Sequence, residues 1–211
     1  MPNLTRAWIR SLAAGGALGV AAWAVNVTST AQLEGSDRAL WAVRTAVSLL
    51  VNAGVVWAGL GVLAGWLVRR PGHAVLAAVA ASELALVMHY GIGSVTGTMP
   101  WASWGDNISW FVAAVVLTGP LGLVGAAARR AGPTGLLARL VVPVGAVVEP
   151  WVTGLIAPGS ANGPADWWAR TAAGSLLLVA GVLGLGVVLL RRPISGPGCV
   201  RADPTGELDR A

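Results

Sequence analysis

The chain of 211 residues has no lysine, one cysteine, one phenylalanine and one tyrosine, and only 11% of it is charged. The lone Cys199 excludes a disulfide within the chain and a metal site built from thiolates. Every one of the 14 Lys-or-Arg positions is arginine, which together with abundant Ala, Gly and Val indicates GC-rich coding and a bacterial source. So few charges also exclude an ordinary soluble domain.

Apolar residues make up 55% of the chain, and the mean hydropathy is +0.71. They form long runs of about 20 residues, the length that crosses a bilayer core, and only helices satisfy their own backbone there. The predicted spans are residues 7–27, 39–68, 73–95, 108–128, 134–156 and 168–190. We therefore expect an all-α polytopic membrane helix bundle over residues 1–192, followed by a disordered cytoplasmic tail, 193–211. The first run also resembles a signal peptide, but five more spans follow it, which favours a retained span.

The arginines are distributed unevenly between the two sides of the predicted bundle. Eleven of the 14 fall on one side: Arg6, Arg10, Arg69, Arg70, Arg129, Arg130, Arg139, Arg191, Arg192, Arg201 and Arg210. The positive-inside rule predicts that both termini are cytoplasmic in a bacterial inner membrane. Because these arginines lie at the ends of apolar runs, the net charge of +5 indicates membrane topology and not a nucleic-acid partner. The sequence does not define an oligomeric state.

Motifs for nucleotides and metals are missing. There is no Walker motif for ATP and no DDxxD cluster for magnesium and a diphosphate, so we expect no cofactor and no metal. Glycines instead recur at helical spacing, as in the pairs Gly15 to Gly19 and Gly61 to Gly65. This GxxxG spacing is typical of closely packed membrane helices.

The exceptional side chains within the spans are Arg44, Asn52, Glu83, His89, Arg139 and Glu149. An ionised group at the centre of a span costs about 2.5–3.5 kcal/mol, so each should face the bundle, pair with a partner or be neutral. With a rise of about 1.5 Å per residue, Glu83 is expected near the midplane. Arg44, His89 and Glu149 are expected at a similar depth in the outer half of the bilayer.

Glu149 interrupts the apolar stretch "VPVGAVVEPWVTGLI" and is followed by Pro150. Because proline lacks an N–H, we expect a kinked fifth helix that lines a cavity beside this acid. A buried acid without a partner should stay protonated, so Glu83 and Glu149 are each either a proton donor or an interhelical hydrogen bonder. Arg44 either snorkels to the surface or is the counter-ion of Glu149. His89 is either an interhelical hydrogen bonder or a catalytic or ligand-binding group.

Tryptophan is concentrated on the side opposite the arginines, with eight of the 11 indoles expected there. An interfacial belt and the lining of an outward cavity are both consistent with this asymmetry. The candidate catalytic residues are Glu149 and Glu83, and the candidate substrate-binding residues are Trp57, Tyr90, Trp110, Trp151, Asn52, His89 and Arg44.

Residues 50–150 resemble a family of small actinobacterial multi-span membrane proteins of unknown function. The resemblance rests on the runs "VNAGVVWAGLGVLAGWLVRRPGHAVLAAVAASELALVMHYG", "ISWFVAAVVLTGPLGLVGAAARR" and "VVPVGAVVEPW". The matching residues are Asn52, Trp57, Tyr90, Trp110, Gly119, Pro120 and Glu149. It implies a membrane bundle in a bacterial inner membrane and no particular activity. The chain is also similar in size, buried acids and aromatic richness to the small integral-membrane terpene cyclases of the pyripyropene type, which have seven spans where six are counted here.

Three functions are consistent with these residues. The first is a membrane-embedded, acid-initiated cyclase acting on a lipophilic isoprenoid substrate, in which Glu149 or Glu83 protonates an alkene or epoxide. Trp57, Trp110 and Trp151 would stabilise the resulting carbocation. The second is a proton-coupled small-molecule transporter with the two acids as titrating groups. The third is a structural or immunity-type membrane subunit whose polar groups only specify helix pairing.

Overall fold

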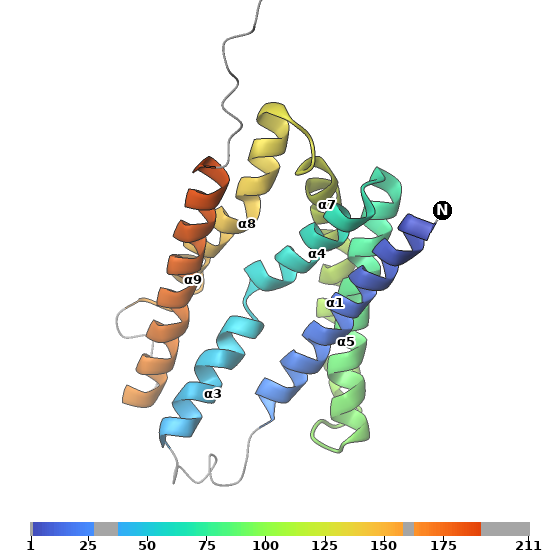
Figure 1. Cartoon of the computed structure of the whole chain (residues 1–211). Helices are drawn as coiled ribbons and strands as arrows, with labels where there is room; N and C mark the ends of the chain where they lie inside the picture. The colour runs from blue at the N-terminus through green and yellow to red at the C-terminus, as the bar shows by residue number, and fades with distance from the viewer. Residues whose placement is uncertain (1, 28–37, 158–162, 191–211) are drawn as a thin grey trace, which may run out of the picture.

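The chain folds into a bundle of helices (Figure 1). The computed structural model describes residues 2–27, 38–157 and 163–190, and within these ranges it contains eight α-helices and no strand. The predicted all-α class is therefore confirmed. Cys199 and the tail predicted for residues 193–211 lie outside the described residues, as do Arg191 and Arg192.

Five of the helices are long and apolar enough to cross a membrane: α1 (Pro2–Asn26), α5 (Pro71–Val95), α7 (Ile108–Ala127), α8 (Gly132–Val152) and α9 (Pro164–Leu190). The protein is thus a multi-pass membrane protein. A short helix, α6 (Ser103–Asp106), precedes α7. The expected span 134–156 is too long, because α8 ends at Val152 and a turn with Gly154 at φ 68° follows. The kink expected beside Glu149 does not end α8 there, since the helix runs on through Pro143 and Pro150.

The prediction of one continuous helix over residues 39–68 is wrong. That stretch forms α3 (Arg38–Val51) and α4 (Gly54–Val68), which are bent by 40° at a break formed by Asn52 and Ala53. Asparagine and glycine are poorer helix formers than the surrounding residues, so the sequence "VNAG" is a weak point in the helix. Neither helix alone is long enough to count as a membrane span, but the two together are. Counting them as one broken span brings the total to six.

The helices form two groups, which meet where α1 packs on α3 and where α4 and α7 pack on α8. Helices α1, α4, α5 and α7 pack on one another, while α9 packs against both α3 and α8. Figure 1 shows the first group beside the second, with α4 crossing toward the end where α1 begins. We call this the arginine-rich end, since Arg6, Arg69 and Arg129 lie at helix termini there. The opposite end, which carries α6, is called the tryptophan-rich end.

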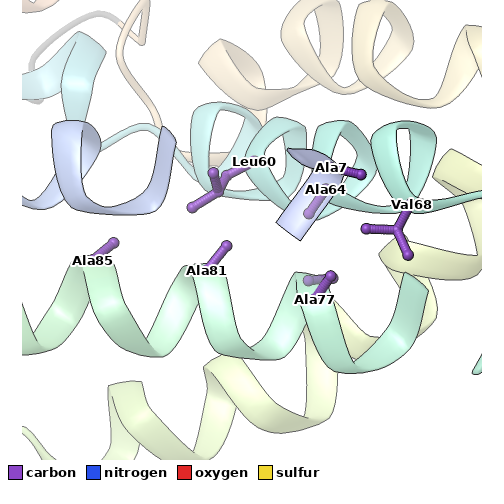
Figure 2. Packing of buried hydrophobic residues seen from close by; sticks show 8 residues of the cluster. Ala7, Leu60, Ala64, Val68, Ala77, Ala81 and Ala85 are labelled. Carbon is purple, nitrogen blue, oxygen red and sulfur yellow. The ribbon is translucent and has the colours of Figure 1, made fainter. Parts of the chain in front are cut away.

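Small residues hold the first group together. A Cβ added at Gly15 of α1 would meet the backbone oxygen of Ala81 on α5, and one added at Gly65 of α4 would meet the carbonyl oxygen of Gly122 on α7. The packing role predicted for the glycine pairs is therefore confirmed. Figure 2 shows the adjoining cluster, in which Ala64 of α4 faces Ala77 and Ala81 of α5.

Candidate functional site

Glu149 closes the break in the second span. Its Oε1 accepts a hydrogen bond from the backbone N–H of Gly54 at 2.6 Å, and its Oε2 accepts one from Val55 at 2.7 Å. These two amides open α4 and have no partner within their own helix, and Ala53 at the N-cap position has no side chain to cap them. The carboxylate on α8 therefore acts as the N-terminal cap of a helix that is distant in the sequence.

The other side of the break is capped by amides. The side-chain nitrogen of Asn52 donates to the carbonyl oxygen of Ser48 at 2.9 Å, which adds a second bond to a group that also accepts the backbone N–H of Asn52 at 2.9 Å. Asn26, the last residue of α1, accepts hydrogen bonds from the Ser48 hydroxyl at 2.6 Å and from Asn52 at 3.3 Å. Both broken ends thus have polar partners, as irregular backbone inside a membrane requires.

Arg44 lies on the same face of α3 but is not the counter-ion of Glu149. Its guanidinium donates to the backbone oxygen of Val25 at 3.2 Å, close to the end of α1. Arg44, Ser48 and Asn52 follow one another at intervals of four residues and share one face of α3, because all three contact the end of α1. The partner of this face is therefore α1, and not α8.

A cavity of about 610 Å³ adjoins the capped break. Its walls come from the end of α1, the break, α4, α5, α7 and the end of α8. The lining residues are Asn26, Asn52, Gly54, Trp57, Ala58, Ser82, Leu86, His89, Tyr90, Trp110, Ala113, Ala114, Leu117, Thr118, Leu121, Glu149 and Thr153. A volume of this size is in the range that holds a small organic ligand.

The cavity is open on the side flanked by α7 and α8. Trp110 and Leu117 on α7 line it although they are 61% and 62% exposed, and Thr153 at the end of α8 is exposed as well. These exposed lining positions place the opening beside two helices that qualify as membrane spans.

Two polar side chains in the lining have atoms without hydrogen-bond partners. The Ser82 hydroxyl is fully buried, and Nδ1 of His89 is buried in a ring that is 9% exposed; neither has a partner in the described part of the chain. Buried polar atoms are almost always paired in proteins. These two are therefore the groups in the cavity that a bound molecule is best placed to satisfy.

An aromatic wall supports the cavity at the tryptophan-rich end. The Tyr90 ring lies 5.7 Å from that of Phe111 and 6.0 Å from that of Trp104, measured between ring centroids, and meets His89 edge-on at 4.8 Å. Trp104 is fixed in turn, because its indole N–H donates to the Ser94 hydroxyl at 3.1 Å. Tyr90 and His89 are therefore presented to the cavity by a packed group of rings.

The structure brings together six of the nine predicted site residues. The residues in the cavity lining are Asn52, Trp57, His89, Tyr90, Trp110 and Glu149. Arg44 lies elsewhere, and Trp151 points away, with 68% of its surface exposed. Glu83 follows Ser82 by one residue, about 100° further around α5, and does not line the cavity.

Several lining groups were not anticipated from the sequence. Asn26 lies at the end of a predicted span and gave no signal beyond its polarity. Ser82 and Thr118 are small polar residues of a kind common throughout membrane helices. The amides of Gly54 and Val55 are backbone groups, which no side-chain pattern reveals. For these amides the one sequence signal was the helix-weakening stretch "VNAG".

The described residues contain no group of three His, Cys, Asp or Glu side chains that could hold a metal ion. Glu149 is the only carboxyl group in the cavity lining, and among the described lining residues there is no arginine. The site thus combines one carboxylate, one imidazole, hydroxyl and amide groups, and three aromatic rings in an apolar wall.

No protein-family model, no curated protein and no solved structure matches the chain. The resemblances to the actinobacterial membrane family and to the pyripyropene-type cyclases therefore stay predictions.

Proposed function

We propose that this protein takes up a lipophilic small molecule from the bilayer in the cavity beside Glu149 and acts on it there. One observation carries the proposal: a cavity of about 610 Å³, open between membrane spans, is lined by apolar side chains with a few convergent polar groups. Sites for small molecules have this composition. A bundle held together only for structural reasons does not require such a space.

The first activity that we consider is acid-initiated cyclisation of an isoprenoid. In this scheme a proton from the Glu149 carboxyl adds to an alkene, the cation closes a ring by attacking a second alkene, and loss of a proton gives the product and restores the acid. The rings of Trp57, Tyr90 and Trp110 line the cavity and would stabilise the cation. Glu83 is no longer favoured as the acid, because it does not line the cavity.

The hydrogen bonds of Glu149 set a condition on this scheme. Both of its oxygens accept bonds from backbone amides, and protonation of either oxygen would weaken the bond that this oxygen accepts. The cyclase scheme therefore requires Glu149 to carry its proton on an oxygen that also accepts a bond from Gly54 or Val55. Protonation would thereby loosen the cap of α4.

The same condition supports the second activity, proton-coupled transport. Discontinuous helices whose ends face a binding site occur in many membrane transporters. Here the discontinuity between α3 and α4 lies at the cavity, and one titratable group holds it together. Protonation of Glu149 would loosen the cap and couple proton binding to a change in the shape of the cavity.

A structural or immunity-type subunit is the third possibility from the sequence. The capping role of Glu149 is fully compatible with it, so Glu149→Gln alone does not separate a structural role from a chemical one. A variant that fills the cavity without touching the cap is more informative. Ala113 on α7 lines the cavity, whereas its neighbour Val112 is 57% exposed on the outside of the bundle.

The test compares Ala113→Trp with the matched control Val112→Trp. Each protein is purified from its native membrane, and bound lipophilic molecules are extracted and identified by mass spectrometry. The proposal predicts a defined molecule with the wild type and with Val112→Trp, and its loss with Ala113→Trp. An identical mixture of bulk lipids from all three proteins would contradict it.

The activity itself is tested by incubating membranes that contain each variant with a panel of prenylated substrates. A cyclised product that disappears with Ala113→Trp and persists with Val112→Trp would support the cyclase. If no product forms but the extracted molecule accumulates inside cells lacking the protein, transport is supported instead.

We also propose six spans with both termini in the cytoplasm of a bacterial inner membrane. Six is the count obtained when α3 and α4 act as one broken span. The sidedness is supported by the arginine-rich end, to which the positive-inside rule assigns the cytoplasmic side.

A further inference from the structure

The charge of the cavity is not balanced by any arginine in the described part of the chain. Arg44 donates to the backbone oxygen of Val25, Arg170 to that of Gly154, and Arg139 to two carbonyl oxygens near the α7–α8 turn. The partners of the Glu149 carboxylate are two backbone amides. An anionic group thus lies at the edge of an apolar space without a cation beside it.

Capping leaves part of this negative charge available. The N-terminus of a helix carries roughly half of an elementary positive charge, so the start of α4 offsets only part of one carboxylate. The two amides occupy two of about four acceptor positions on the carboxylate oxygens. Glu149 lines the cavity, and a charge acts over a longer distance in such apolar surroundings than in water.

Aromatic rings surround the same space. Trp57 lies three residues after Gly54, one turn further along α4 and on the same face. Its indole therefore lines the cavity one helical turn from the capped end. Tyr90 comes from α5 and Trp110 from α7, so that three helices each contribute one ring. The face of an indole or phenol ring attracts cations, most strongly away from water.

We propose that the cavity selects a lipophilic organic cation, with Glu149 supplying the charge and Trp57 and Trp110 supplying the ring faces. This inference rests on the proposed function and names the chemical class of its ligand. The mostly apolar lining favours a cation shielded by apolar groups over a small hydrated one. A carbocation formed from a hydrocarbon belongs to the same class, so cation selectivity is compatible with either proposed activity.

The experiment uses the full-length protein in lipid nanodiscs and two ions of the same shape and opposite charge, tetraphenylphosphonium and tetraphenylborate. Binding is measured by equilibrium dialysis, with empty nanodiscs as the blank for partition into lipid. We expect saturable binding of tetraphenylphosphonium and none of tetraphenylborate. We also expect Trp57→Leu to weaken binding of the cation about tenfold.

Trp151→Leu is the matched control, because Trp151 is an exposed indole outside the cavity. It should bind tetraphenylphosphonium like the wild type. If Trp57→Leu and Trp151→Leu weakened binding of tetraphenylphosphonium equally, the assignment of the cation to this cavity would be overturned. Monodisperse elution of each variant from a sizing column establishes that it is folded, and Trp110→Leu replaces Trp57→Leu if that variant fails.

The outcomes also separate this inference from the proposed function. Saturable binding of both ions, abolished by Ala113→Trp, would overturn cation selectivity and leave the cavity as a site for lipophilic molecules. Absence of saturable binding of the cation overturns the present inference, whereas the extraction experiment decides the proposed function independently.

Discussion

Glu149 and Gly54, separated by 95 residues in the sequence, are joined by a hydrogen bond of 2.6 Å from the backbone N–H to the carboxylate. The contact connects the end of α8 to the start of α4, and therefore links the two groups of helices. A second bond from Val55 to the other oxygen makes it bidentate. Hydrogen bonds with a charged partner are the stronger kind, which suits a helix end placed away from water.

Replacing Glu149 should destabilise the protein in a graded order. Alanine leaves both amides of α4 without acceptors, and we expect a loss of about 2–4 kcal/mol. Glutamine keeps one acceptor oxygen but turns an NH₂ group toward the second amide, so its loss should be smaller. Thermal unfolding of the detergent-solubilised proteins measures the order wild type, Glu149→Gln, Glu149→Ala.

Glu83→Gln is the control for this series, because Glu83 is also a carboxyl group within a span but its buried Oε1 has no hydrogen-bond partner in the described part of the chain. We expect its unfolding temperature to lie close to that of the wild type. If Glu149→Ala unfolded at the wild-type temperature too, the capping role of this carboxylate would be disproved.

The hydrogen bond can also be removed from the side of the helix. Gly54→Pro deletes the N–H donor and places a ring carbon toward Oε1, while the extended conformation of Ala53, with φ −60° and ψ 136°, is one that a residue before proline adopts readily. We expect a loss of at least about 1–3 kcal/mol. The double variant with Glu149→Gln should lose less stability than the sum of the losses in the two single variants, since both substitutions remove the same contact.

Gly54→Ala is the matched control. It keeps the N–H, and its Cβ would lie 3.5 Å from the Glu149 oxygen, which is an ordinary contact. Its unfolding temperature should therefore stay near the wild-type value. If Gly54→Ala lowered the unfolding temperature as much as Gly54→Pro, the effect would come from steric crowding at residue 54 and not from loss of its N–H.

Adjacent glycines on α1 should respond in opposite ways to the same substitution. Gly15→Ala places a methyl group against the backbone of Ala81, so α1 and α5 must separate, and we expect a loss of about 1–3 kcal/mol. Gly16→Ala meets nothing within 4 Å and should stabilise the helix by up to about 1 kcal/mol. Thermal unfolding of the two variants side by side checks the packing, and equal shifts would argue against it.

The sidedness of the bundle is measurable with single cysteines in a Cys199→Ser background. Gly105→Cys and Thr134→Cys occupy exposed positions at opposite ends of the structure. If the termini are cytoplasmic, a membrane-impermeant maleimide should label Gly105→Cys on intact cells and Thr134→Cys only after permeabilisation. The reverse pattern would invert the proposed topology.

The helical class and the close packing follow from the sequence because they depend on local features. Apolar runs of sufficient length give membrane helices, and glycines such as Gly15 and Gly65 give close contacts whatever their partner helices are. The grouping of Ser48 and Asn52 follows from helical spacing. Their partner, Asn26, does not, because it depends on how helices distant in sequence pack together.

The role of Glu149 shows where sequence reasoning stops. The sequence marks the glutamate as exceptional and predicts a kink beside it in its own helix. The break that it caps lies in the facing helix, at Asn52 and Ala53. A carboxylate that satisfies backbone amides leaves no sign at the positions it contacts, because any residue except proline supplies an N–H. Gly54 and Val55 therefore carry no chemical signature of the contact.

The alanine and glycine contacts among α1, α4 and α5 have a further thermodynamic consequence. These residues have no side-chain rotamers, so bringing the three helices together costs almost no side-chain conformational entropy. Ala64, Ala77 and Ala81 also have no alternative conformation into which the interface could relax. This half of the molecule should therefore behave as a stiff frame, and most of the freedom of the bundle should lie where α3, α8 and α9 meet it.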